Sequence, residues 1–171
     1  MTNKFQESNI AFRAIVEQDQ EFLYQVYAST RLEEMSASGW TAEEIEAFLR
    51  QQFDFQHRDY MRNYTSAQFD LILKNDVPVG RLYVHRRGAD IRIIDIALLI
   101  QHRKKGIGAA IFKDLMAEAD GIGATLSLHV EMNNPILPYY ERLKFINKGE
   151  KGVYYFMERA PKRTATGGIN E

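Results

Sequence analysis

The sequence contains no cysteine. This absence excludes disulfide bonds, thiolate metal ligands and a cysteine nucleophile. No apolar stretch approaches the roughly 20 residues that a membrane-spanning helix needs, and the first fifteen residues lack the basic-then-apolar pattern of a secretory signal. The four histidines show no metal-ligand spacing. These absences predict a soluble, cytoplasmic protein without a metal site and without a membrane partner.

Neither sign of charge is in excess. Lys and Arg number 22 and Asp and Glu 23, so the formal net charge is −1 and the pI is about 6.4. A protein without a wide basic face has no general attraction to nucleic acid, although Arg86, Arg87 and the basic residues 102–105 keep nucleic-acid binding as a lesser alternative. With 171 residues, 45% of them hydrophobic, we expect one domain over residues 1–160, followed by a flexible polar tail over residues 161–171.

Hydrophobic spacing and turn residues predict the order of helices and strands. The order is βααβββαβαββ, which defines an α/β protein with a mixed, mostly antiparallel sheet of about seven strands flanked by helices, because hairpins and helix crossovers both occur. Expected strands are residues 11–16, 69–73, 79–85, 91–100, 125–130, 145–150 and 153–158; helices start near residue 17, at a capping box of Thr41 and Glu44, at Gly106, and at Asn134.

The tripeptide Gly-Ile-Gly occurs twice, and its context differs between the two copies. Residues 121–123 follow a predicted helix and precede a strand. Glycine just past a helix end usually supplies the left-handed residue of the C-cap. We therefore interpret this second copy as the structural end of the helix.

The first copy, residues 106–108, follows a strand and a basic turn and opens a helix. Glycine in a helix costs about 1 kcal/mol relative to alanine, and close approach of backbone N–H groups to an anionic ligand is one reason to accept that cost. The alternative is a solvated basic turn with one sterically required glycine. The dinucleotide fingerprint would require glycine or alanine where Ile111 stands, and the Walker pattern lacks its Gly-Lys-Ser/Thr, so neither known phosphate loop fits.

The pattern Arg103-x-x-Gly106-x-Gly108 does resemble another motif, the Q/R-x-x-G-x-G/A of the GNAT superfamily of N-acetyltransferases. Residues 134–145, NPILPYYERLKF, resemble that family's N-P-x-x-x-L-Y-E-K-L-G-F segment, with Lys144 in place of the usual glycine and Tyr139 in place of leucine. Pro138 would lie one turn into a helix opened by Asn134 and Pro135. The resemblance covers residues 11–158 and implies a GNAT-type acyl-CoA N-acyltransferase fold.

The resemblance implies an enzyme that transfers the acetyl group of acetyl-CoA to a primary amine of a small molecule or protein, by direct attack in a ternary complex. Tyr140 is the implied catalytic acid; its alternative is a buried aromatic core residue. The implied contacts to acetyl-CoA come from the end of the fourth strand, the basic glycine turn and the later helix: Ala97, Leu98, Leu99, Arg103, Lys104, Lys105, Gly106, Ile107, Gly108, Ala109, Asn134 and Tyr140. A catalytically silent acyl-CoA-binding module on the same fold is the competing interpretation.

Other candidates have structural alternatives that the sequence favours. Asp95 suits a general base if it is buried, or an ion pair with Arg81 or Arg92. His85 and His129 are more often sheet residues than catalysts. The acceptor is expected between the first two helices and the late strands, and a homodimer through those strands follows the family analogy. An acidic, aromatic connection would suit a cationic amine, but a solvated helix end is the simpler interpretation of Glu33, Glu34, Trp40, Glu43 and Glu44.

Overall fold

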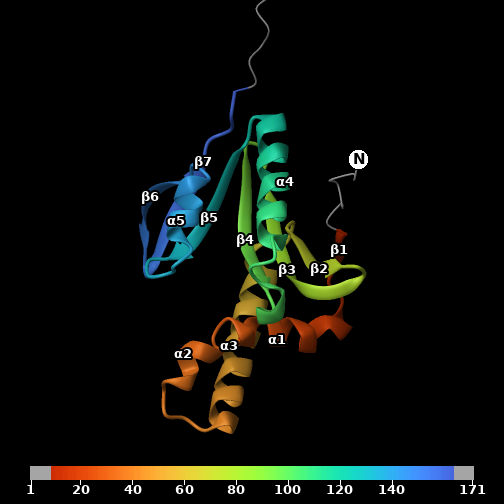
Figure 1. Ribbon diagram of the computed structural model, residues 1–171, viewed down its shortest axis with the longest axis vertical. Helices are drawn as coiled ribbons and strands as arrows, with labels where there is room; N and C mark the ends of the chain where they lie inside the picture. The colour runs from red at the N-terminus through yellow and green to blue at the C-terminus, as the bar shows by residue number, and fades with distance from the viewer. Residues whose placement is uncertain (1–8, 164–171) are drawn as a thin grey trace, which may run out of the picture. The chain divides into compact units, whose positions relative to one another are not determined.

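The structure, a computed structural model, describes residues 9–163 (Figure 1). Its strands are β1 (Ile10–Ala14), β2 (Gln68–Lys74), β3 (Val77–Arg86), β4 (Asp90–Leu98), β5 (Thr125–Glu131), β6 (Ile146–Lys151) and β7 (Tyr154–Arg159). Its helices are α1 (Gln20–Ser29), α2 (Leu32–Ser36), α3 (Ala42–Asn63), α4 (Ile107–Ile122) and α5 (Leu137–Arg142), with 3-10 turns η1 (Glu17–Asp19) and η2 (Ile100–His102).

Seven strands form one mixed sheet in the order β1-β2-β3-β4-β5-β7-β6. The pairs β1/β2, β2/β3, β5/β7 and β6/β7 are antiparallel, and β4/β5 is parallel. A parallel neighbour requires a crossover, and α4 supplies it between β4 and β5. The predicted fold class is confirmed: the sheet has the expected seven strands, and the order of elements is the predicted one apart from the additional short helix α2.

The chain divides into two compact units. The first unit comprises the chain up to His85 together with Asp95–Ala110, and the second comprises Arg86–Ile94 together with the chain from Ile111 onward. The first unit packs α1 and α3 together through aromatic contacts: the ring of Phe53 lies 6.0 Å from that of Tyr24 and 5.9 Å from that of Tyr27. Its buried core includes Leu23, Val26, Leu49, Leu71, Ile72, Val79 and Tyr83.

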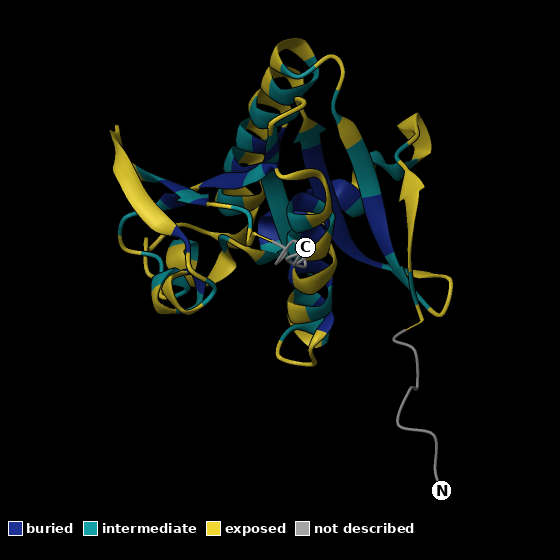
Figure 2. Ribbon diagram, turned by 90° about the horizontal axis from the view of Figure 1, so that it is seen from above, coloured by how far each residue is buried: buried dark blue, intermediate teal, exposed yellow. Residues whose placement is uncertain are grey.

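The second unit packs the apolar stripe of α4 against the sheet. Along β5, Leu126, Leu128 and Val130 are buried, while His129 on the other face is exposed. Strand β6 lies at the end of the sheet order and is exposed along its whole length (Figure 2). The core of this unit includes Ile111, Phe112, Leu115, Phe145 and Met157.

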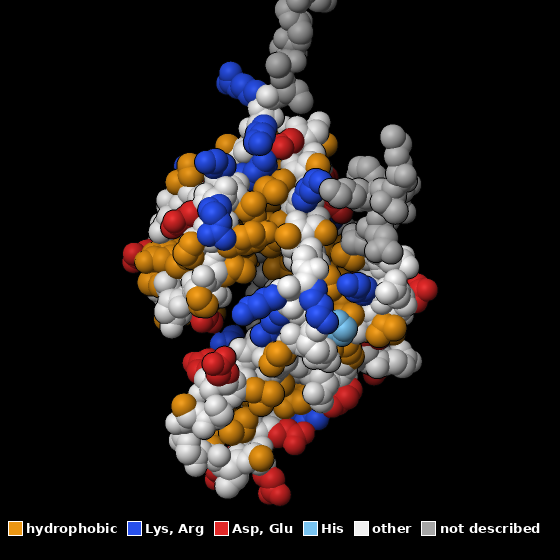
Figure 3. Space-filling view, in the orientation of Figure 1, with side chains coloured by type: hydrophobic (Ala, Val, Ile, Leu, Met, Phe, Trp, Pro, Cys, Tyr) orange, Lys and Arg blue, Asp and Glu red, His pale blue; other side chains and the backbone are white. Residues whose placement is uncertain are grey.

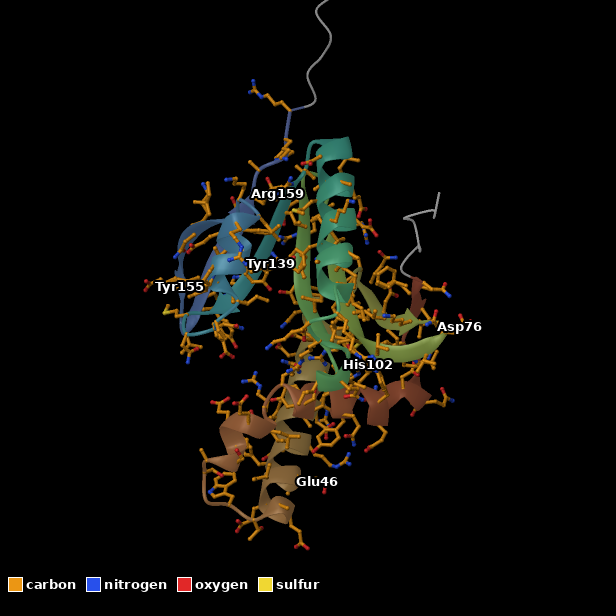
Figure 4. All side chains as sticks on the ribbon, in the orientation of Figure 1. Glu46, Asp76, His102, Tyr139, Tyr155 and Arg159 are labelled. Carbon is orange, nitrogen blue, oxygen red and sulfur yellow. The ribbon has the colours of Figure 1, made fainter. Side chains whose placement is uncertain are left out.

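Local signals held at several predicted boundaries. Thr41 accepts a hydrogen bond from the Glu44 N–H (3.2 Å) and Glu44 accepts one from the Thr41 N–H (2.8 Å), which confirms the capping box. Asn75 and Asp76 have φ of 50° and 65°, the paired left-handed values of a tight hairpin turn; Figure 4 shows Asp76 at the tip between β2 and β3.

The predicted helix start at Asn134 and Pro135 is wrong. Helix α5 begins at Leu137, after an N-cap residue, Ile136, that makes no side-chain cap bond. The Asn134 side chain instead accepts the Ile136 N–H at 3.0 Å and forms a turn. Pro138 therefore stands at the second helical position, where its missing N–H would have no intrahelical partner, and not one turn into the helix.

Two other boundaries differ from the prediction. The strand expected to reach Ile100 ends at Leu98, because the chain turns into η2. A short helix that was not predicted, α2, lies between α1 and α3. Neither difference changes the topology.

The single-domain prediction for residues 1–160 stays a prediction. Of the predicted tail, residues 164–171 lie outside the described residues, and the Lys162 N–H donates to Asp120 at 2.8 Å. No helix in residues 9–163 combines the length and apolar character that a bilayer crossing requires. The predicted cellular location stays a prediction.

Candidate functional site

The turn before α4 has an unusual backbone. Lys104 has φ of 58° and Gly106 has φ of 86°, whereas Lys105 between them is not in the left-handed region. A left-handed conformation costs a lysine about 1 kcal/mol or more. Alternation of this kind turns successive N–H groups toward one side of the chain, an arrangement that binds anions.

The N–H groups of this turn have no backbone hydrogen-bond partner among residues 9–163. Within residues 9–163, the backbone hydrogen bonds resume only at Ala110, whose N–H donates to the Gly106 carbonyl at 3.0 Å. The N–H groups of residues 104–109 are therefore free at the positive end of the α4 dipole. Lys104 and Lys105 are exposed beside them, and neither side chain has a hydrogen-bond or ion-pair partner in the described part of the chain. Figure 3 shows Lys and Arg side chains gathered on this face around the start of α4.

The two glycines of the turn are not required by crowding within the chain. A Cβ added at Gly106 or at Gly108 would meet no atom of the described residues within 4 Å. Gly106 is explained by its positive φ, but Gly108 has a helical position and an open surround. A ligand approaching the backbone is a physical reason for glycine at position 108, so this donor arrangement fits a phosphate-bearing group.

Arg103 is directed into the protein. Its Nε donates to the Leu98 carbonyl at 2.8 Å and one terminal nitrogen donates to Ser29 Oγ at 3.2 Å. The side chain thus connects the turn to the last residue of β4 and the last residue of α1. Figure 4 labels His102, which precedes this arginine at the same turn.

The end of β4 extends past the segment that pairs with β5. Registered pairs of β4 with β5 run from Asp90–Thr125 to Ile93–Leu128, so residues 94–98 follow the last pair. Leu99 N–H donates to Val79 O at 2.9 Å. On the neighbouring strand, a Cβ at Gly80 would come within 2.2 Å of Ala97 O; only glycine fits there.

The remaining predicted site residues, Asn134 and Tyr140, belong to the second unit. Asn134 Oδ1 is used in the turn described above, and its Nδ2 has no partner among residues 9–163. Tyr140 is 6% exposed on α5. Its ring lies 5.5 Å from that of Phe112 and 5.7 Å from that of Phe145, and Tyr139, labelled in Figure 4, is 6.0 Å away. The aromatic packing fixes the ring.

Asp95 forms an ion pair with Arg81, which is the structural alternative to a role as general base. Its Oδ2 accepts from Arg81 at 2.5 Å, and the same arginine donates to Gln56 at 2.9 Å. Arg81 is only 3% exposed. Burial is the largest single influence and lowers the pKa of Arg81, but Asp95, Tyr83 and Tyr60 together raise this pKa above its usual value. The pair keeps a buried cation compensated, as such burial requires.

The histidines considered from the sequence make structural contacts. His85 bonds Ser66 at 2.9 Å, and the ring of His129 lies 5.1 Å from that of Phe156. Burial lowers the pKa of His129, and Arg92 and Lys151 lower it further. In residues 9–163, no group of three or more His, Asp or Glu side chains is arranged to hold a metal ion.

The acidic connection has partly structural roles. Glu44 belongs to the capping box, and the rings of Trp40 and Phe48 lie 5.3 Å apart in an edge-to-face contact. Glu33 and Glu34 lie on α2 and are exposed. These contacts agree with the solvated helix end that the sequence favoured.

Two residues that shape the site were not identified from the sequence. Gly80 had a usable signal, since an isolated glycine within a strand pattern indicates close backbone approach. Ser29 had none, because its contact with Arg103 joins positions 74 residues apart.

In residues 9–163, a run of unpaired N–H groups follows the parallel strand β4 and precedes α4, an arrangement that suits a phosphate-bearing ligand. The family model of the acetyltransferase (GNAT) family matches residues 24–145, and the chain belongs to this family. This confirms the predicted class of enzyme, an acetyl-CoA-dependent acyltransferase. No curated relative matches the sequence.

Solved structures share the fold at low sequence identity. The PaiA N-acetyltransferase of Thermoplasma acidophilum, solved with coenzyme A, is 16% identical with a TM-score of 0.64, covering 88% of this chain and 98% of that one. An acetyltransferase of Thermus thermophilus is 16% identical, with a TM-score of 0.60 and coverage of 89% and 97%. The ribosomal-protein-S18-alanine N-acetyltransferase of Escherichia coli is 14% identical, with a TM-score of 0.58 and coverage of 94% and 99%. These likenesses show the fold.

Proposed function

We propose that this chain transfers the acetyl group of acetyl-CoA to a primary amine, of a small molecule or of a protein, by direct attack of the amine in a ternary complex. The observation that carries the proposal is the run of N–H groups at residues 104–109, which have no partner within residues 9–163. Such donors at a helix start, with exposed Lys104 and Lys105 beside them, suit a pyrophosphate.

The binding contacts follow from the groups that the fold leaves available. Backbone N–H groups of residues 104–109 hold the pyrophosphate, and the two lysines add charge. Backbone groups of residues 97–99, at the end of β4, hold the pantetheine arm. Asn134 contributes its Nδ2, the part of its amide that the turn leaves free.

Acetyl-CoA supplies the acetyl group as a thioester. The amine nitrogen forms a bond to the carbonyl carbon, the carbon–sulfur bond breaks, and the amine proton leaves to a base or to water. We assign Tyr140 as the acid that gives its proton to the departing sulfur. Its aromatic surroundings hold the ring in one orientation, which an acid acting on a fixed atom needs.

The first experiment is the melting temperature with acetyl-CoA, free coenzyme A or ATP. A hundredfold excess of ligand over its dissociation constant stabilises the native state by about 2.7 kcal/mol, which shifts the melting temperature of a chain this size by roughly 5 to 10 °C. We expect that shift with both coenzyme A forms and a smaller one with ATP. The absence of a shift at high acetyl-CoA concentration would overturn the proposal.

The Tyr140→Phe variant separates an enzyme from a silent binding module. We expect turnover to fall by about 100-fold, the lower range for an acid–base group, while coenzyme A affinity stays at the wild-type value. Turnover unaffected by this substitution would remove Tyr140 from the mechanism.

A further inference from the structure

Arg103 makes two hydrogen bonds to neutral acceptors. Nε donates to Leu98 O at 2.8 Å, and a terminal nitrogen donates to Ser29 Oγ at 3.2 Å. Ser29 in turn donates its own hydroxyl proton to Val26 O at 2.7 Å. The hydroxyl therefore acts as donor to α1 and as acceptor from Arg103, so the orientation of both groups is defined.

The guanidinium of Arg103 differs in burial and in hydrogen bonding from the neighbouring side chains of Lys104 and Lys105. Arg103 is half-buried and bonded to the protein, whereas Lys104 and Lys105 are exposed and have no partner within residues 9–163. All of the groups that Arg103 contacts belong to the first unit, as does the turn itself. The side chain fixes three segments of that unit together: the end of α1, the end of β4 and the start of the turn.

The turn needs such an anchor because its backbone is unfavourable when left alone. Lys104 is held at φ 58°, a conformation that surrounding structure must impose on a lysine. Ile107, which is 2% exposed, anchors the far end of the turn in the core. Arg103 anchors the near end, so the free N–H groups lie between two fixed residues.

We propose that Arg103 is a positioning residue for the acyl donor. It aligns the N–H groups of residues 104–109 through its bonds to Leu98 and Ser29, and the positive charge at the phosphates comes from Lys104 and Lys105. The inference rests on the proposed function, because it assigns how that phosphate turn is kept ready to bind.

Three substitutions at this position separate geometry from charge. Arg103→Gln places an amide nitrogen the same number of bonds from the backbone as Nε, so it can keep the Leu98 bond without a charge. Arg103→Lys keeps the charge but has one nitrogen, one bond further out. Arg103→Met keeps neither the charge nor the bonds. Ser29→Ala keeps the Leu98 bond and removes the second bond of Arg103, together with the bond from Ser29 to Val26 O.

The test is the dissociation constant for coenzyme A by calorimetry, at temperatures where each variant is folded by circular dichroism. We expect Arg103→Gln to stay within about threefold of wild type, Ser29→Ala to lose about threefold, and Arg103→Lys and Arg103→Met to lose about tenfold, the size expected for one hydrogen bond. As a comparison of charge, Lys105→Gln should weaken binding by roughly fivefold at low salt and less at high salt.

The opposite rescue pattern, with Arg103→Lys near wild type and Arg103→Gln as weak as Arg103→Met, would overturn the inference and make Arg103 a direct phosphate ligand. Unchanged affinity in all four variants, with lowered melting temperatures, would overturn it in favour of a purely structural role. Wild-type protein that does not bind coenzyme A would overturn the proposed function, and this inference with it.

Discussion

The two ends of α4 carry the same tripeptide, Gly-Ile-Gly, but differ in whether their backbone groups are hydrogen-bonded. At the C-terminal end, Gly123 has φ of 69°, its N–H donates to Asp120 O at 3.3 Å, and the Ala124 N–H donates to Ala119 O at 2.8 Å. These paired bonds form a Schellman motif, which satisfies the last carbonyls within the backbone. At the N-terminal end, the N–H groups of residues 104–109 have no partner in the described chain. The comparison teaches that the direction of the helix, and not the tripeptide, decides which end is available to a ligand.

The largest expected effect is on stability and lies at the C-terminal end of α4, called the closed end because the Schellman motif satisfies its carbonyls. The Asp120 carboxylate accepts from Arg159 at 2.9 and 3.1 Å and from the Lys162 N–H at 2.8 Å. Asp120→Ala leaves Arg159, only 4% exposed, without its counter-charge, so we expect a loss of about 3 kcal/mol in the free energy of unfolding by urea. Coenzyme A affinity should not change. If the fully folded variant bound coenzyme A more weakly than wild type, the two ends of α4 would not be independent.

A matched pair of glycine substitutions compares the two ends directly. Gly108 and Gly121 both lie in α4, and a Cβ added at either position meets no atom of the described residues within 4 Å. Each substitution by alanine should raise the stability of the free protein by up to about 1 kcal/mol. Only Gly108→Ala should weaken coenzyme A binding, by about tenfold, or roughly 1.4 kcal/mol. Equal affinities in calorimetry would show that no ligand approaches the backbone at Gly108.

Substitution of Gly123, the left-handed residue at the closed end, should change stability and leave ligand binding unchanged. Gly123→Ala should cost about 1 kcal/mol, because alanine is strained at this positive φ. The measurement is urea denaturation, with coenzyme A affinity as the control. A neutral result would mean that the helix end relaxes to another cap.

A substitution at Lys144 should remove the left-handed backbone strain that Gly123→Ala introduces. It has φ of 73°, at the end of α5, and is exposed. Lys144→Gly should relieve about 1 kcal/mol of strain and lose roughly half of that gain to the greater freedom of glycine in the unfolded chain. We expect a small rise in melting temperature. A fall would indicate that the lysine side chain contributes packing that outweighs the strain.

The smallest effect is the pH dependence at the closed end. Hydrogen bonds from Arg159, and then from the Lys162 N–H, hold the pKa of Asp120 below its usual 3.8. A carboxyl with a lowered folded-state pKa stabilises the fold above its unfolded pKa, and this contribution is lost as pH falls through the folded value. The stability difference between wild type and Asp120→Asn should therefore be constant near neutrality and shrink below about pH 4. A difference that is independent of pH would contradict the ion pair.

Much of the fold was predictable because its signals are local. The capping box at Thr41 and Glu44, the hairpin turn at Asn75 and Asp76, and both glycine pairs act within a few residues of chain. The start of α5 was not predictable in the same way. Asn134 can cap a helix or close a turn through the same side-chain oxygen, and Pro138 fits only when the helix begins at Leu137.

The sequence by itself determined the order of the strands and of the longer helices, since this depends on spacing along the chain. For the same reason it determined which glycine pair begins a helix and which ends one, and it carries the family motif. The tertiary structure alone decided the partners of the charged side chains. Arg103 could have pointed outward with Lys104, and Asp95 could have paired with Arg92; Ser29 and Arg81 are their partners because folding brings together residues far apart in sequence. A charge shows that a side chain needs a partner or solvent, and only packing decides which of these it finds.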